Sequence, residues 1–220
     1  MKIVIQCAAK KRPDTGYLAN SNGTRILFVA DPENAPLYKD TLYARPDDIA
    51  EDGKTWRELL LDYNKLEDNP LELSPAYKLY MNGAYQMLVD RYGVNNVFIL
   101  SAGWGLIDAA FLTPKYDITF SPSADAYKHR RKRDHYNDLC MLRADSDDDL
   151  VFFGGKDYLP LFCKLTQNYL GNRFVFYNSA IQPNTPGCTL IRYRTSTRTN
   201  WHYGCAKDFI AGEMGIHAPS

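Results

Sequence analysis

The 220-residue sequence has no long hydrophobic run, no excess of charge of either sign and no paired-cysteine motif. No stretch reaches the roughly eighteen consecutive apolar residues of a membrane-spanning helix, and the start MKIVIQCAAKK lacks the apolar core of a secretory signal. We therefore expect a cytoplasmic protein without a membrane partner. Lys and Arg total 26, as do Asp and Glu, which excludes a uniformly basic nucleic-acid sleeve and an acidic tail protein.

Several motifs of catalysis and metal binding are also absent. The five cysteines are odd in number and never spaced C-x-x-C, so we expect free, mostly buried thiols rather than disulfides or a zinc site. There is no G-x-x-x-x-G-K-[ST] phosphate loop and no G-x-S-x-G serine-hydrolase motif. The four histidines have no ligand spacing, and we therefore expect neither a metal nor a cofactor.

What the sequence does contain is typical of one folded α/β domain. Aromatic residues make up 13% of the chain, which disfavours disorder. Short, mostly uninterrupted apolar runs predict buried strands at Lys2–Gln6, Arg25–Ala30, Asn96–Leu100, Leu150–Phe153, Arg173–Tyr177 and Thr189–Tyr193. Helical patterns are found at Thr55–Leu66, Pro75–Tyr92, Ala124–Arg143, Tyr158–Leu170 and Ala206–Met214.

This alternation predicts a central, mainly parallel or mixed sheet flanked by helices, with residues 1–220 in a single domain. A stretch with several Pro and Asp residues at about 31–70 is interpreted as an excursion on that sheet. Ligands of open α/β sheets bind beyond the carboxyl ends of the strands, so we expect the functional residues just after the predicted strands.

Three strand ends carry unusual residues. Cys7-Ala8-Ala9-Lys10-Lys11-Arg12 offers cations to a phosphate or carboxylate, although a loop of solvated lysines is the simpler interpretation. In Ser101–Ile107, Trp104 between two glycines predicts a platform for stacking a base; equally, it could fill the core above a glycine turn. Gly154-Gly155 would expose backbone N–H groups at a helix start, and a plain turn fits as well.

Two basic stretches complete the set of candidate segments. Residues 127–133, Y-K-H-R-R-K-R, fall inside a predicted helix, where the alternative is a solvated helix surface. Residues 192–203 interleave arginines with aromatic and hydroxyl side chains, a mixture that favours phosphate contacts combined with base stacking. The residues we predict to bind nucleic acid are Arg130, Arg133, Arg192, Arg194, Arg198, Trp201 and His202.

The motif S-A-G-W-G-L-I, followed by P-K-Y-D-I-T-F, resembles the signature of the YaaA-like superfamily of bacterial and phage proteins. The first strand ending in C-A-A-K-K and the later G-G-K-D-Y are similar to two further elements of that family, in the same order. Trp104 stands where many relatives have Tyr. The resemblance implies one α/β domain associated with nucleic acid, with roles in protecting DNA under oxidative stress or in glycosylase chemistry on modified bases.

From these segments we predict an enzyme that cleaves the N-glycosidic bond of a base, most simply in DNA. Such chemistry needs a carboxylate to stabilise a cation-like sugar or activate water, and an aromatic stack for the base. Asp117 is the first candidate carboxylate and Asp157 the second, although a capping or salt-bridging role explains Asp117 as well. The predicted substrate-binding residues are Cys7, Lys10, Lys11, Ser101, Trp104, Gly105, Tyr116, Gly155 and Tyr158.

Two other classes of function fit the same residues. A non-catalytic protein that binds or shields DNA needs the basic segments and aromatics but no placed carboxylate. A hydrolase or transferase of free nucleotides would use the same pocket, and the balanced net charge favours it over extended DNA binding. All three require the strand-end motifs to share one cleft at the carboxyl edge of the sheet.

Overall fold

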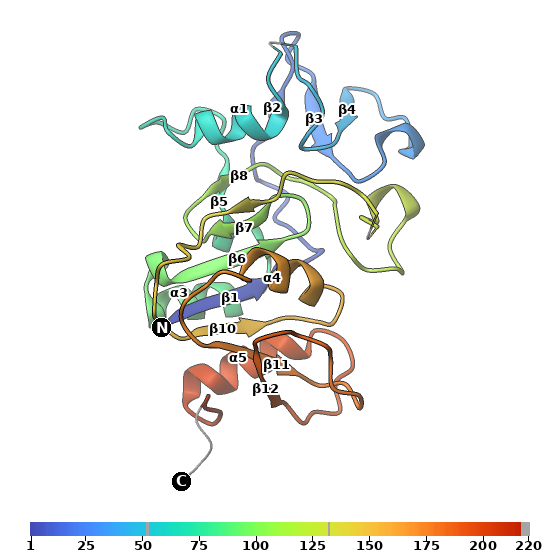
Figure 1. Ribbon diagram of the computed structural model, residues 1–220. Helices are drawn as coiled ribbons and strands as arrows, with labels where there is room; N and C mark the ends of the chain where they lie inside the picture. The colour runs from blue at the N-terminus through green and yellow to red at the C-terminus, as the bar shows by residue number, and fades with distance from the viewer. Residues whose placement is uncertain (52, 132, 217–220) are drawn as a thin grey trace.

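A seven-stranded mixed sheet lies at the centre of the computed structural model, which describes residues 1–51, 53–131 and 133–216 (Figure 1). Its order is β12-β11-β10-β1-β6-β7-β9. The strands β12 to β6 in this order are parallel, whereas β7 runs antiparallel to β6. Their bounds are β1 Lys2–Gln6, β6 Val97–Ser101, β7 Gly105–Asp108, β9 Leu139–Cys140, β10 Leu150–Phe153, β11 Arg173–Tyr177 and β12 Thr189–Arg192.

The predicted central sheet is thus confirmed, because four of the apolar runs form its buried strands β1, β6, β10 and β11, whereas the run at Thr189–Tyr193 forms the partly exposed edge strand β12. Every residue of β6 and β10 is buried. In β1, Ile3 pairs with Val97 on one side and Val151 on the other, which places the first strand between two strands from much later in the chain. Continuous burial of this kind is typical of parallel strands with helices on both faces.

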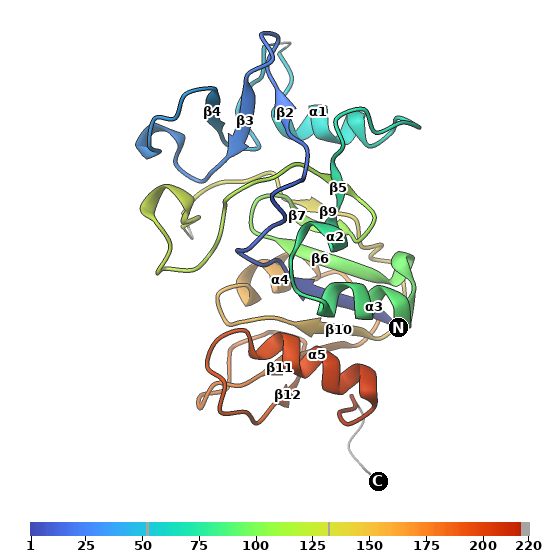
Figure 2. The same cartoon turned by 180° about the vertical axis from the view of Figure 1, so that it is seen from behind.

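Helices cover both faces of this sheet. Comparison of Figures 1 and 2 shows α3 and α5 on one face and α4 on the other. Neighbouring aromatic residues of β10 explain the arrangement, since the Phe152 ring stacks on Phe162 of α4 while Phe153 packs edge-on against Phe209 of α5. The helices are α1 Trp56–Tyr63, α2 Ala76–Leu79, α3 Ala84–Tyr92, α4 Leu159–Leu165 and α5 Trp201–Ala211.

A second, three-stranded sheet lies apart from the central one, at the top of Figure 1. It consists of β2 Leu18–Ala19, β3 Arg25–Phe28 and β4 Thr41–Ala44, next to α1. The prediction that Arg25–Ala30 is a strand of the central sheet was therefore wrong, because β3 belongs to this small sheet, where it pairs with β2 and β4 and is partly exposed. A two-stranded sheet of β5 Ser74–Pro75 and β8 Leu112–Thr113 joins the two parts. The 3-10 helices are η1 Pro32–Asn34, η2 Val94–Asn96 and η3 Ala126–Lys128.

Two predicted helices differ from the structure. The Ala124–Arg143 segment contains only η3 and the short strand β9 in its described part, because its side chains form ion pairs within an irregular loop. The Pro75–Tyr92 pattern is split between α2 and α3, since Tyr80 is extended and pairs with Lys11 in an isolated β-bridge. No helix in the described part of the chain is long and apolar enough to cross a membrane.

Candidate functional site

A cleft of about 800 Å³ opens at the carboxyl ends of β1, β10 and β11. In the sheet order, β6 lies on one side of β1 and β10 on the other. The chain leaves β1 towards the side of β6, whereas it leaves β10 towards β11 on the opposite side. Open α/β sheets bind their ligands where two such connections diverge, here between β1 and β10. The cleft is lined by residues 6–10, 81–82, 154–159, 177–179 and 198–203, together with Thr119, Ser121 and Pro183.

The two main walls of the cleft are tied together directly. The Gln6 side-chain oxygen accepts a hydrogen bond of 2.6 Å from the backbone N–H of Gly155. At Gly154, an added Cβ would lie 2.3 Å from the Phe152 ring, so only glycine fits there. Gly155 lines the cleft as predicted for a substrate-binding residue, but its N–H is already bonded and α4 has only seven residues, so our alternative interpretation, a plain strand-to-helix turn, describes this segment.

Four exposed charged residues face the cleft. Lys10, Lys156 and Arg198 are exposed cations, and Asp157 is an exposed carboxylate between the Gly155 turn and Tyr158. Among the residues that the structure describes, none forms a hydrogen bond or an ion pair with the Asp157 carboxylate. The cleft thus combines a surplus of positive charge with one available carboxylate.

The first turn of α5 forms another wall of the cleft. Its N-cap residue Asn200 has φ 59° and makes no side-chain capping hydrogen bond. The next residues are held firmly, since the Trp201 ring stacks on Tyr193 with centroids 6.0 Å apart. His202 is only 2% exposed, and its Nε2 has no hydrogen-bond partner within the described ranges. Desolvation lowers the pKa of His202 to about 4, so the imidazole is neutral at pH 7.

A layer of buried hydroxyl and thiol groups lies at the base of the cleft. Cys7 Sγ and the Tyr158 hydroxyl share a hydrogen bond of 3.2 Å. The Tyr85 hydroxyl donates to the Gln6 carbonyl oxygen at 2.8 Å and also contacts the Tyr203 hydroxyl. Burial raises the pKa of Tyr158 and Tyr85 well above 10 and that of Tyr203 to about 12, so these phenols stay protonated.

Lys11 differs from its neighbour Lys10, although we predicted that both hold phosphate. Lys11 is 9% exposed, and its Nζ donates to the carbonyl oxygens of Ala8 and Ala9 at 3.3 and 3.4 Å. The ammonium group lies 4.2 Å from the centroid of the Tyr116 ring. Desolvation lowers the pKa of Lys11. Lys11 therefore stabilises the loop after β1 by binding its carbonyl oxygens. Of the two lysines, Lys10 is the one whose amine is accessible to a ligand.

The segment after β6 does not reach the cleft. Trp104 is fully buried against Phe28, with ring centroids 5.1 Å apart, so it offers no face to a base. Ser101 Oγ donates to the Tyr116 hydroxyl and accepts from the N–H of Gly103 and Trp104, which makes it part of the turn. Our alternative interpretation, a tryptophan filling the core at a glycine turn, describes this segment.

Tight packing holds the two other residues predicted near that turn. Gly105 has φ 95°, and a Cβ there would lie 2.4 Å from the Leu139 carbonyl oxygen, so glycine is needed for β7 to approach β9. Tyr116 is 1% exposed, and its hydroxyl also lies 2.7 Å from that of Tyr80. Neither residue lines the cleft, and their predicted contact with substrate is not supported by their position.

Asp117, our first candidate carboxylate, lies outside the cleft and is paired. Its side chain forms an ion pair with Lys128 Nζ at 3.1 Å, and its backbone N–H donates to the Phe28 carbonyl oxygen. The salt-bridging alternative therefore describes Asp117. Asp157, our second candidate, is the carboxylate that the fold places in the cleft.

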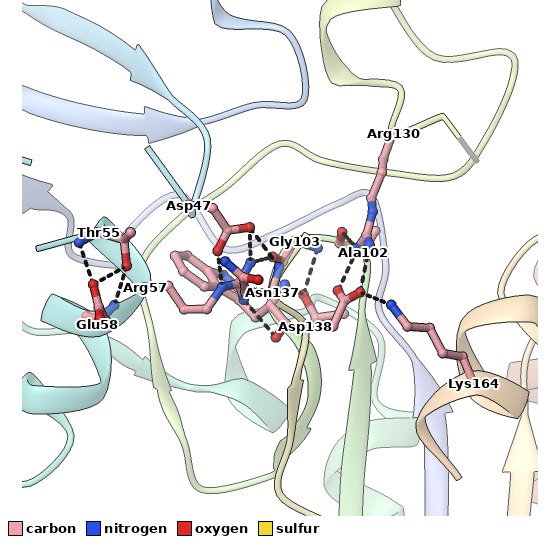
Figure 3. A network of polar contacts seen from close by, with 12 residues as sticks. Asp47, Thr55, Arg57, Glu58, Ala102, Gly103, Arg130, Asn137, Asp138 and Lys164 are labelled. Atoms are coloured by element: carbon pink, nitrogen blue, oxygen red, sulfur yellow. Dashed lines mark hydrogen bonds and ion pairs between the residues drawn. The ribbon is translucent and has the colours of Figure 1, made fainter. Parts of the chain in front are cut away.

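Two cations of the first basic stretch, Lys128 and Arg130, form ion pairs. Arg130 is 6% exposed and forms two bonds of 2.7 Å with Asp138, while also donating to the Ala102 carbonyl oxygen (Figure 3). Arg130 is thus a buried structural residue and not a contact for nucleic acid. Arg133 is exposed, but in a separate hollow beside His135, and Lys132 lies outside the described residues.

The second basic stretch is divided between the cleft and the sheet edge. Arg198, Trp201 and His202 line the cleft. Arg192, at the end of β12, and Arg194 are exposed and lie outside the cleft lining. This is the one predicted nucleic-acid segment that contributes side chains to the site.

Sequence reasoning missed the wall formed by Met81 and Asn82, because they fall inside a continuous helical pattern. The available signal was the Asn82-Gly83 pair, which is typical of a break or turn. Within the described residues, no three His, Cys, Asp or Glu side chains are grouped so that they could hold a metal ion. Comparisons with family models, with curated proteins and with solved structures found no match.

Proposed function

We propose that the protein hydrolyses the N-glycosidic bond of a nucleotide that enters the cleft singly. The observation that carries this proposal is the carboxylate of Asp157, which has no partner among the described residues and lies in a cleft of about 800 Å³ whose other exposed charges are cations. That volume is of the order needed to enclose one small ligand such as a nucleotide. A nucleobase substrate is also what the resemblance to the YaaA-like superfamily implies.

The phosphate is assigned to the side of the cleft formed by α5. The first turn of this helix lines the cleft without a side-chain cap, which places the positive end of the helix dipole at this wall. Arg198 and Lys10 add positive charge. The unpartnered Nε2 of neutral His202 supplies a further hydrogen-bonding group, because a buried polar atom without a partner is costly unless a ligand satisfies it.

The reaction is assigned to Asp157 and Tyr158. The Asp157 carboxylate takes a proton from water while the water oxygen attacks the anomeric carbon of the sugar. The bond to the base breaks, its electron pair goes to the base nitrogen, and that nitrogen takes a proton from solvent, to which Asp157 afterwards releases the proton that it took from the water. Tyr158 lines the same cleft and has a raised pKa, so its phenol can donate a hydrogen bond to the leaving base.

A single nucleotide suits this protein better than a DNA duplex. Duplex binding needs several accessible cations along the backbone, but Arg130 is buried with Asp138 and Lys128 is paired with Asp117 and Asp125. The accessible cations that line the cleft are Lys10, Lys156 and Arg198, a number that suits one phosphate group rather than a duplex backbone. Oligonucleotides are therefore included as a competing class in the test.

The test offers purified protein nucleoside monophosphates, the matching nucleosides and single-stranded oligonucleotides, and measures released base by chromatography. We expect release from monophosphates in preference to nucleosides. Asp157→Asn should lower kcat by roughly 10²- to 10⁴-fold with nucleotide binding retained, because the amide keeps the shape and loses the charge.

The matched control is Asp117→Asn, the same substitution at a carboxylate outside the cleft, which should retain turnover. Base release from oligonucleotides alone would replace the single-nucleotide substrate with nucleic acid. Absence of release from every substrate, or equal turnover in Asp157→Asn and the unaltered protein, would overturn the proposed chemistry.

A further inference from the structure

A second hollow, of about 290 Å³, lies between the small three-stranded sheet and the loop that follows η3. It shares no lining residue with the cleft. Residues after β3 and β4 line one side and residues of the loop line the other: Ala30, Asp31, Arg45, His129, Arg131 and residues 133–136. Its volume is close to the lower limit of pockets that enclose a ligand, so the hollow suits one small molecule or ion.

Three arginines line this hollow, and much of their hydrogen-bonding capacity is unused. Neither the Arg131 nor the Arg133 guanidinium forms a hydrogen bond or an ion pair with any residue in the ranges that the structure describes. Arg45 is oriented through its Nε, which donates to the Ala30 carbonyl oxygen at 3.1 Å. Its terminal nitrogens lie 3.9 and 4.0 Å from two carboxylates, too far for hydrogen bonds. Several guanidinium N–H groups are therefore available to an added acceptor.

The two carboxylates of the hollow do not cancel this positive charge. Asp134 accepts a hydrogen bond of 2.7 Å from the backbone N–H of Arg131, and Asp31 accepts one of 2.9 Å from the Asn34 side chain. Three arginines stand against these two aspartates, and the two histidines of the lining add further N–H donors. The hollow therefore keeps a positive excess that attracts an anion.

The Tyr136 side chain adds a hydroxyl group to the lining of the hollow. Its oxygen is buried and has no hydrogen-bond partner within the described ranges. The ring is held by the Arg130 guanidinium, 3.8 Å from the ring centroid, and Asp138 fixes that guanidinium in turn. Burial raises the pKa of Tyr136, so the phenol stays protonated and can donate. A buried donor without a partner is costly unless a ligand accepts its hydrogen bond, which indicates a ligand independently of the arginines.

We propose that this hollow binds one small phosphate group, either as the free ion or as the end of a phosphate monoester. The oxygens of a phosphate accept several hydrogen bonds at once, and the planar fork of an arginine matches two of them. A carboxylate has only two oxygens, fewer than the donors of Arg131, Arg133 and Tyr136 require. The proposal does not depend on the hydrolysis assigned to the cleft, because the two sites share no lining residue.

The test measures binding by isothermal titration calorimetry to a chain that carries Lys10→Ala and Arg198→Ala, which removes the cations assigned to phosphate in the cleft. The probes are inorganic phosphate, glycerol 3-phosphate and acetate. We expect saturable binding of one phosphate group per chain and roughly tenfold weaker binding of acetate, which accepts fewer charge-assisted hydrogen bonds. The tighter of the two phosphate probes identifies the source. Absence of phosphate binding would overturn the proposal, and equal affinity for acetate would overturn the phosphate class.

Substitutions at the hollow locate the site. In the same background, Arg133→Ala should weaken phosphate binding by roughly 10- to 100-fold, because hydrogen bonds to a charged group are lost. Arg194→Ala is the matched control, since Arg194 is exposed and lines neither the cleft nor the hollow, and its affinity for phosphate should not change. Equal affinities of these two variants would exclude the hollow as the binding site.

A third variant separates ligand binding from folding. Tyr136→Phe removes only the hydroxyl group, so phosphate binding should weaken by roughly tenfold. The unfolding temperature of the phosphate-free chain should not fall, because no hydrogen bond within the described residues is lost. A lower unfolding temperature with unchanged phosphate affinity would assign the hydroxyl a structural role and remove it from the site.

Discussion

The segments that follow β1 and β6 leave the same edge of the sheet but end in different surroundings. After β1 the chain passes Cys7 and Lys10 along the cleft. After β6 it turns back at once through Ser101–Gly105 into antiparallel β7, and Trp104 is fully buried. A ligand site at the strand ends is therefore expected at β1 and β10, whose connections diverge. It is not expected after β6, because a tight hairpin fills the space at its own end with side chains.

A second difference is what covers each strand end. The turn after β6 is closed by Arg57 of α1, which donates to the carbonyl oxygens of Gly103 and Trp104 and is itself held by Asp47 (Figure 3). The small sheet and α1 thus cover the β6 side of the edge. Nothing equivalent among the described residues covers the β1–β10 side, and this is where the cleft remains open.

The largest expected effect is on the stability of the turn after β6, the strand end that the small sheet and α1 cover. Trp104→Ala should lower the free energy of unfolding by about 3–5 kcal/mol, because it removes a fully buried indole and leaves a cavity against Phe28. Urea unfolding followed by circular dichroism measures this loss. Nucleotide affinity of the folded variant should not change, and a loss below about 1 kcal/mol would contradict the packing described for this ring.

An intermediate effect on stability is expected at His202, which is buried in the wall of the cleft between β1 and β10. Its pKa is about 4 in the folded protein against an ordinary value of 6.5, so the unfolded chain binds more protons between these pH values. Stability therefore falls as the pH drops through this window, by about 2 kcal/mol from pH 7 to pH 5 for this group alone. Urea unfolding at both pH values should show a smaller loss in His202→Gln.

The matched control for this pH dependence is His135→Gln, an exposed histidine, which should keep the loss seen in the unaltered protein. An unchanged pH dependence in His202→Gln would mean that the imidazole is not desolvated as described.

The smallest expected effect on stability is at Lys10. Lys10→Ala should change the free energy of unfolding by no more than about 0.5 kcal/mol, because the side chain is exposed. Its effect should be on nucleotide binding, measured by isothermal titration calorimetry, where loss of a cation weakens affinity for monophosphates more than for nucleosides. Equal weakening for both ligands would remove Lys10 from the phosphate side of the cleft.

The parts of the fold that were predictable are those encoded locally. The runs at Lys2–Gln6, Leu150–Phe153 and Arg173–Tyr177 have the same bounds in sequence and structure, because continuous apolar residues serve a strand buried on both faces. The capping box of Thr55 and Glu58 likewise marks the start of α1.

The parts that failed depend on partners distant in the sequence. Arg130 was predicted to contact nucleic acid from a helix, but its partners are Asp138 and the Ala102 carbonyl oxygen, a contact that no helical pattern predicts. The helix over Pro75–Tyr92 is broken by pairing with Lys11, far back in the chain. For the same reason, the sequence identified Cys7 and Asp157 as candidates but could not distinguish them from Trp104 and Asp117.

The central position of β1 also sets the order in which the molecule can be completed during synthesis. This strand is made before both of its neighbours, with which it pairs through Val97 and Leu150. The last wall of the cleft to be made is the first turn of α5 at Trp201–Tyr203. Contacts of such wide sequence separation form late. A nascent chain that stops before α5 has no complete cleft and exposes Phe153 and Phe176, which pack against Phe209 in the finished protein.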